Sequence, residues 1–154
     1  MLSLSQKKSV FVATKKSFVI ESKTFTPSVI YSNQTVTSFP YIMLNYIDEL
    51  NRDQNAIGNV IGTGGNHGQR STAFLSFNIE AKDSQNLKNH DIAQGIASQL
   101  WADIQANWQS LSSDTVKLKS ISNIRNLTAV NLSAGIFDTC RYGFDCRLLY
   151  SFYW

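Results

Sequence analysis

The chain has 154 residues, is 43% hydrophobic and carries a formal net charge of +3, which favours one soluble globular domain with its own core. Only 16% of its residues are charged, against about 25% in an ordinary domain, and this favours a protein whose faces are covered by partners. No apolar run suits a signal peptide or a membrane span. We therefore expect a protein made in a cytosol, without a membrane partner.

Residues 1–28 are expected to form an extended, basic N-terminal arm. The β-branched and aromatic runs at 10–14 and 17–20 show no helical periodicity, so an edge hairpin is the alternative. The lysines of the arm could contact phosphate, with Phe11, Phe18 and Phe25 as stacking platforms, or could protect a sheet edge from aggregation. The lysines that are candidates for contact with DNA or with a neighbouring chain are Lys7, Lys8, Lys15, Lys16 and Lys23.

Two strands and a long loop are expected next. Residues 39–47 are apolar at nearly every position and predict a strand covered on both faces, while the alternation over 72–80 predicts its antiparallel partner. The intervening region 48–71 holds five of the eight glycines. It lacks both the Gly-Lys-Ser/Thr of a phosphate loop and Gly-x-Gly-x-x-Gly. We expect a segment that orders against a neighbouring molecule, with a floppy hairpin tip as the alternative.

The hydrophobic period then changes to that of a helix. Apolar residues recur at spacings of three and four from Ile92 to Leu111, which predicts an amphipathic helix of about twenty residues, capped near Asn89 or Asp91. Trp101 and Trp108 fall on its apolar stripe and are expected in the core. Gly95 inside this helix indicates the close approach of another backbone.

Three further strands are expected over residues 116–121, 127–133 and 141–154. The last alternates strictly and would run roughly 45 Å at about 3.3 Å per residue, longer than usual. It is therefore either a long core strand or one that lies across a second molecule. Cys140 and Cys146 would be roughly 20 Å apart along the extended chain, too far for a disulfide.

The order of these elements predicts the α+β class. We expect a single domain over 29–154 with a mostly antiparallel sheet, one long amphipathic helix packed across it, and the N-terminal arm in front. Neither His67 nor His90 belongs to a recognisable catalytic or metal-binding motif. We therefore expect no enzyme activity, no cofactor and no metal.

Several short motifs follow one another in a suggestive order. They are Val-Ile-Tyr-Ser-Asn-Gln at 29–34, Pro-Tyr at 40–41, a polar loop, the strand at 74–79, Asp83, the helix at 93–100, and Arg-Tyr-Gly-Phe-Asp at 141–145. This succession resembles the tail and neck terminator proteins of tailed bacteriophages. The resemblance covers residues 29–154 and implies an α+β subunit without enzyme activity. Such subunits form a ring, usually a hexamer, that caps the tail tube or joins it to the head.

The resemblance also implies location and partners. It implies a structural protein of the virion tail or neck, made in the bacterial host cytoplasm. Its partners would be copies of itself, a tail-tube protein and a head-completion or adaptor protein, with transient contact to viral DNA in the lumen. These proteins commonly start with a helix, so the basic arm found here would instead reach a neighbouring subunit or another virion component.

Candidate residues for subunit contacts come from the glycine-rich loop and the terminal strand. Arg141 and Asp145 share one face of that strand and could pair with each other or reach the next subunit. The candidates are Arg52, Gly64, Gly65, Asn66, His67, Arg70, Arg141 and Asp145. Two alternative functions remain open: another phage tail or head-tail adaptor protein, or a small nucleic-acid-binding module that uses the basic arm.

Overall fold

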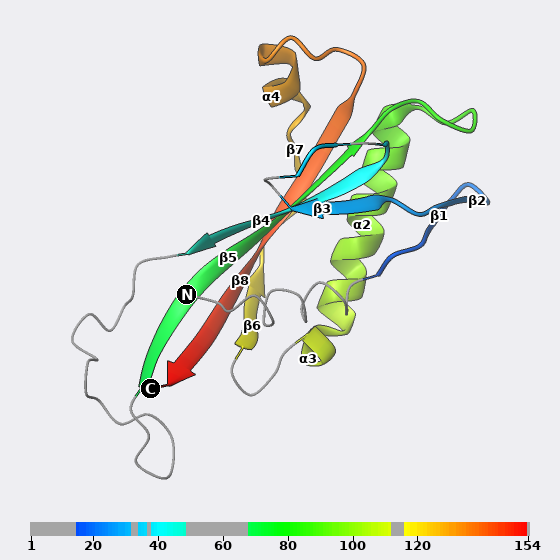
Figure 1. Cartoon of the computed structure of the whole chain (residues 1–154). Helices are drawn as coiled ribbons and strands as arrows, with labels where there is room; N and C mark the ends of the chain where they lie inside the picture. The colour runs from blue at the N-terminus through cyan, green and yellow to red at the C-terminus, as the bar shows by residue number, and fades with distance from the viewer. Residues whose placement is uncertain (1–14, 32–33, 37, 49–67, 112–115, 154) are drawn as a thin grey trace.

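The computed structural model describes residues 15–31, 34–36, 38–48, 68–111 and 116–153 (Figure 1). In these residues it confirms the expected α+β class, a mostly antiparallel sheet with one long helix packed across it. The elements in chain order are β1 (Phe18–Ile20), β2 (Lys23–Phe25), β3 (Ser28–Tyr31), β4 (Tyr41–Asp48), β5 (Gly68–Ala81), α2 (Asn89–Ala106), α3 (Trp108–Leu111), β6 (Val116–Ile121), β7 (Arg125–Asn126), α4 (Thr128–Ser133) and β8 (Cys140–Tyr153). None of the helices in this described part is long and apolar enough to cross a membrane.

The main sheet has the strand order β3-β4-β5-β8-β6, and β7 also pairs with β8. Its pairs are antiparallel except for β3 with β4, which is parallel. The strands β5 and β8 are paired along their whole length, from Gly68 opposite Tyr153 to Ala81 opposite Cys140, and they run side by side through the molecule (Figure 1). Two predictions are thus confirmed: the long terminal strand, and the antiparallel pairing of β4 with β5.

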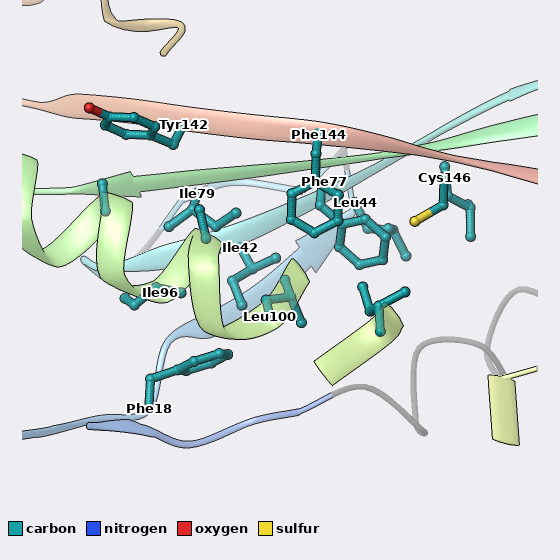
Figure 2. Close-up of a cluster of buried hydrophobic side chains, with 14 of the residues drawn as sticks. Phe18, Ile42, Leu44, Phe77, Ile79, Ile96, Leu100, Tyr142, Phe144 and Cys146 are labelled. Carbon is teal, nitrogen blue, oxygen red and sulfur yellow. The ribbon is translucent and has the colours of Figure 1, made fainter. Parts of the chain in front are cut away.

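The core lies between α2 and one face of this sheet. Alternation along β8 places Tyr142, Phe144, Cys146 and Leu148 on that face, all of them buried. Phe144 stacks on Phe77 of β5, with ring centroids 5.2 Å apart (Figure 2). The helix contributes Ile92, Ala93, Ile96, Ala97, Leu100 and Ile104, all buried. The predicted amphipathic stripe is therefore confirmed over these six residues.

The described part of the N-terminal segment forms a hairpin, the alternative to the extended arm, and this hairpin is folded onto α2. The β1–β2 hairpin buries Phe18 and Phe25, at 0% and 3% exposure. Gln99 of α2 accepts the Val19 N–H and donates to the Val19 carbonyl, at 3.3 and 2.6 Å. The close neighbour expected at Gly95 is a side chain rather than a backbone, since a Cβ there would lie 2.9 Å from Ile20 Cδ1. The core thus includes residues from the segment predicted to be an arm.

The long helix differs from its prediction at both ends. The Asn89 N–H donates to Asp83 Oδ1 at 2.8 Å, so the helix start is satisfied by Asp83 and not by Asn89 or Asp91. At the other end α2 stops at Ala106 and α3 begins at Trp108. Because of this break Trp108 leaves the apolar stripe and is 46% exposed, so its predicted core position is wrong. Trp101 does pack against the core.

The strand predicted over residues 127–133 is wrong, because most of this segment is helical. Of residues 125–133, only Arg125 and Asn126 pair with β8, and α4 begins at Thr128. Asn126 Oδ1 accepts the N–H of Thr128 at 3.0 Å, which supports a helix start. After the helix Gly135 adopts φ +81°, the left-handed conformation with which many helices end.

The loop predicted over residues 48–71 is wrong at both ends, where the residues belong to strands. Asp48 is the last residue of β4 and Gly68 the first of β5, because the β5 pairing with β8 extends to the glycine. Residues 49–67 lie outside the described residues, as does the prediction that they order against a neighbour. Cys140 and Cys146 are both free, as expected from their spacing, and both are buried.

Candidate functional site

The Arg-Tyr-Gly-Phe-Asp motif at 141–145 lies in the first half of β8. Here β8 is flanked by β5 on one side and by β7 and the end of β6 on the other. Tyr142 and Phe144 face the core, so the alternation of the strand places Arg141, Gly143 and Asp145 on the sheet face opposite α2. The contacts of these three residues show what the motif does in the fold.

Asp145 joins three segments of the chain. Its Oδ2 forms an ion pair with Arg125 Nη2 at 2.7 Å, and its Oδ1 accepts the Ser76 hydroxyl at 2.5 Å. Its backbone N–H donates to Ser122 Oγ at 2.8 Å. Among the described residues, the ion-pair partner of Asp145 is therefore Arg125 and not Arg141. The sequence predicted that Arg141 and Asp145 share a face of the strand and pair with each other or with the next subunit. It did not predict β7, which supplies Arg125.

Gly143 leaves space for the segment that crosses the sheet. A Cβ at this position would lie 2.8 Å from the Phe77 carbonyl oxygen, 2.8 Å from Asn78 Oδ1 and 2.9 Å from Leu127 Cδ1. Leu127 can rest this close to the sheet because residue 143 has no side chain. Arg141 holds the same segment through its backbone, since its N–H donates to Thr128 Oγ1 at 3.1 Å and its carbonyl accepts the Leu127 N–H at 2.8 Å. The motif thus docks β7 and α4 on β8.

A buried polar cluster fixes the position of α4. Glu80 of β5, Asn131 of α4 and Thr139 are exposed by only 6%, 3% and 4%. The Asn131 amide and the Thr139 hydroxyl both donate to Glu80 Oε1, the second at 2.9 Å, and the amide also donates to Thr139 Oγ1 at 2.9 Å. A buried carboxylate is costly unless it is hydrogen-bonded, so this cluster specifies where α4 sits.

The segment held in this way exposes large apolar side chains. Val130 and Leu132 of α4 are 55% and 49% exposed, and Ile136 and Phe137 in the following turn are 43% and 76% exposed. We call these four residues the α4 patch. In Figure 1 α4 projects from the end of the sheet, away from the body of the domain. Val130 and Leu132 are two positions apart in α4 and so point to different sides of the helix. The patch is therefore a segment rich in exposed apolar side chains, which makes it a candidate for an interaction site. This patch was not predicted from the sequence, which indicated a sheet strand over residues 127–133.

A small apolar groove is lined by residues of α3, of β6 and of the end of α2. In Figure 1 α3 and β6 lie at the other end of the molecule from α4. The volume of the groove is about 250 Å³, below the roughly 300–1,000 Å³ of typical small-molecule sites. We call it the Trp108 groove. It is lined by Gln105, Trp108, Leu118, Lys119, Ser120 and Ile121.

A histidine with a phenol and a thiol nearby is the other chemically notable group. The Tyr142 hydroxyl lies 2.8 Å from His90 Nδ1, and Cys140 Sγ lies 3.9 Å from the same nitrogen. Burial raises the pKa of Tyr142. Burial, and to a smaller extent the negative charge of Asp145, raise the pKa of Cys146 to about 12. The Cys146 thiol therefore stays protonated at neutral pH and is a poor nucleophile. In the described ranges no three His, Cys, Asp or Glu side chains are placed to share a metal ion.

The remaining predicted contact residues fall in or near the loop and the arm. Arg70 lies in β5, opposite Ser151 of β8. The other predicted loop residues, Arg52, Gly64, Gly65, Asn66 and His67, lie outside the described residues, as do Lys7 and Lys8.

The described lysines of the arm belong to the hairpin and its approach. Lys15 Nζ is 5.9 Å from the centroid of the Phe18 ring, Lys16 is exposed, and Lys23 Nζ donates to the Gln85 carbonyl. Because Phe18 and Phe25 are buried, neither can stack on a nucleotide base as the nucleic-acid alternative requires. That alternative loses two of its three aromatic platforms, and Phe11 lies outside the described residues.

No protein-family model matches this sequence, and no curated protein sequence is significantly similar to it. The geometry of the motif, the α4 patch and the Trp108 groove is therefore the ground on which a function can be proposed.

Proposed function

We propose that this chain is a structural subunit of a tailed-bacteriophage virion that assembles into a ring of six copies and terminates the tail tube or joins it to the head. The observation that carries the proposal is the α4 patch. Four large apolar side chains within residues 130–137 stay between 43% and 76% exposed. A surface of this kind is stabilised when a partner covers it.

The way the patch is held supports an assembly role. The Glu80, Asn131 and Thr139 cluster and the Asp145 contacts fix the segment on the sheet before any partner arrives. A preorganised surface loses less conformational entropy on binding, so more of the contact energy appears as affinity. The motif that resembles the phage terminator proteins is the same one that docks this segment.

The proposal includes specific partners. They are further copies of the chain in the ring, a tail-tube protein on one side and a head-completion or adaptor protein on the other. Viral DNA would pass through the lumen and contact the subunits only transiently, and the protein would reside in the tail or neck of the virion.

Co-assembly tests this function directly. The full chain is mixed with a purified tail-tube protein and imaged by negative-stain electron microscopy, with tube protein alone as the control. We expect rings, and tubes that end in an added ring of density only when the chain is present. Salt-sensitive retention of DNA without rings or tube binding would contradict the proposal and favour the nucleic-acid alternative.

A further inference from the structure

We propose that the α4 patch of one copy inserts Phe137 into the Trp108 groove of the next copy, so that the chain associates head to tail. This inference rests on the proposed function, because it names the surfaces through which the ring would form. The partner is a second copy of this chain.

The two surfaces match in size and chemistry. Phe137 is the most exposed member of the patch, at 76%, and an aromatic side chain buries about 150–250 Å² when it is covered. The groove offers about 250 Å³ bounded by the apolar side chains of Trp108, Leu118 and Ile121. That space suits one aromatic side chain, with Ile136 beside it at the mouth.

The charges at the rims are complementary. Asp138 follows Phe137 directly. Its carboxylate forms an ion pair with Lys82 at 3.2 Å, but both side chains are exposed, at 68% and 45%, so the carboxylate can accept a second cation. Lys119 lines the groove on the opposite surface and is exposed. Insertion of Phe137 would bring this carboxylate and this ammonium close together. Opposite charges at a rim steer association and fix its register.

The placement of the two surfaces suits a ring. In Figure 1, α4 lies at the opposite end of the molecule from α3 and β6, the elements that border the Trp108 groove. A copy that uses both the α4 patch and the groove therefore contacts two different neighbours. A contact between two unlike surfaces repeats from copy to copy and closes into a ring when the rotation between neighbours allows it. A twofold-symmetric dimer would instead use the same patch on both copies.

Two substitutions on exposed side chains separate the surfaces. Phe137→Glu removes the apolar insert, and Ser120→Arg fills the groove without touching the core. Val19→Glu is the matched control, since Val19 is also exposed, at 55%, but belongs to β1 and to neither surface. We expect all three to melt within about 2 °C of the unchanged chain.

Sedimentation velocity measures self-association of each full-length chain over a concentration series. We expect Phe137→Glu and Ser120→Arg each to weaken association at least about tenfold, with Val19→Glu unchanged. Mixing the two defective chains in equal amounts pairs the intact groove of one with the intact patch of the other. The mixture should therefore form a dimer of twice the 17.3 kDa subunit mass and grow no further.

The outcomes distinguish this inference from the function on which it rests. If the unchanged chain assembles and Phe137→Glu assembles equally well, the head-to-tail contact is wrong while the ring function stands. The same holds if the mixture of defective chains forms no dimer. If the unchanged chain stays monomeric at every concentration, alone and with a tail-tube protein, both fall.

Discussion

Gly143 is the position where a single added methyl group tests the packing of β7 and α4 on the sheet. In Gly143→Ala the new Cβ would sit 2.8 Å from the Phe77 carbonyl oxygen and from Asn78 Oδ1, and 2.9 Å from Leu127 Cδ1, where ordinary van der Waals contacts are 3.4–4 Å. The Phe77 carbonyl belongs to the paired backbone of β5 and β8, so it cannot move aside without distorting the sheet.

The expected magnitude follows from two opposing terms. Overpacking a filled site costs about 1–3 kcal/mol, and replacing glycine by alanine returns about 0.5–1 kcal/mol through the lower entropy of the unfolded chain. The free energy of unfolding should therefore fall by about 1–2 kcal/mol. For a chain of this size this lowers Tm by roughly 2–8 °C.

Urea unfolding followed by circular dichroism measures this fall in the free energy of unfolding. An unchanged m value would show that the folded and unfolded states keep their compactness. Leu127→Ala removes one of the three crowded neighbours, so the double variant should lose at least about 0.5 kcal/mol less than the sum of the two single changes. Equal or higher stability of Gly143→Ala, or strict additivity with Leu127→Ala, would refute the close packing of Leu127 over residue 143.

Three further predictions concern the same region. Asp145→Ala leaves the hydroxyl of Ser76 and the guanidinium of Arg125 without their acceptor, so the free energy of unfolding measured by urea titration should fall by about 1–2 kcal/mol. For Arg125→Ala, which removes only the ion pair, we expect a fall of about 0–1 kcal/mol. Equal losses would contradict the double role of the carboxylate. The pKa of Cys146 is raised from 9.0 to about 12 in the fold, so the folded state binds the thiol proton more tightly than the unfolded state does. The stabilisation from this thiol is therefore complete below pH 9 and declines as the pH rises toward 12. Between these pH values the free energy of unfolding should fall by up to about 1.4 kcal/mol per pH unit. The same fall in a Cys146→Ala chain would contradict this assignment to Cys146. Gly135→Ala places a side chain at φ +81° in open space, so a loss of about 1–2 kcal/mol is expected from the backbone alone, and unchanged thermal melting would argue against that conformation.

The elements that sequence periodicity predicted correctly are those whose burial is set by one continuous face. On β8 the alternation holds because one face packs on α2, and the spacing of Ile92, Ile96 and Leu100 holds because the same contact buries them. In both cases the residues that are apolar in the sequence pattern are the ones that pack together in the core, so the periodicity predicts the element correctly.

The errors occur where distant contacts decide the local structure. Residues 127–133 lack a distinct period, and the contact that fixes their helix joins Asn131 to Glu80, 51 positions away. Asp145 was placed on the correct face, but its partner Arg125 is 20 positions away and depends on the register of β7 against β8. The exposure of Trp108 depends on a helix break at Asn107 that the apolar spacing does not reveal.

Native mass spectrometry of the full-length chain over a range of micromolar concentrations is the most direct test of ring assembly. We expect a closed species of six times the 17.3 kDa subunit mass and no larger oligomers. A closed ring occupies every α4 patch and every Trp108 groove, so no further copy can add. A single species at 17.3 kDa across the whole range, unchanged when a tail-tube protein is added, would contradict ring assembly.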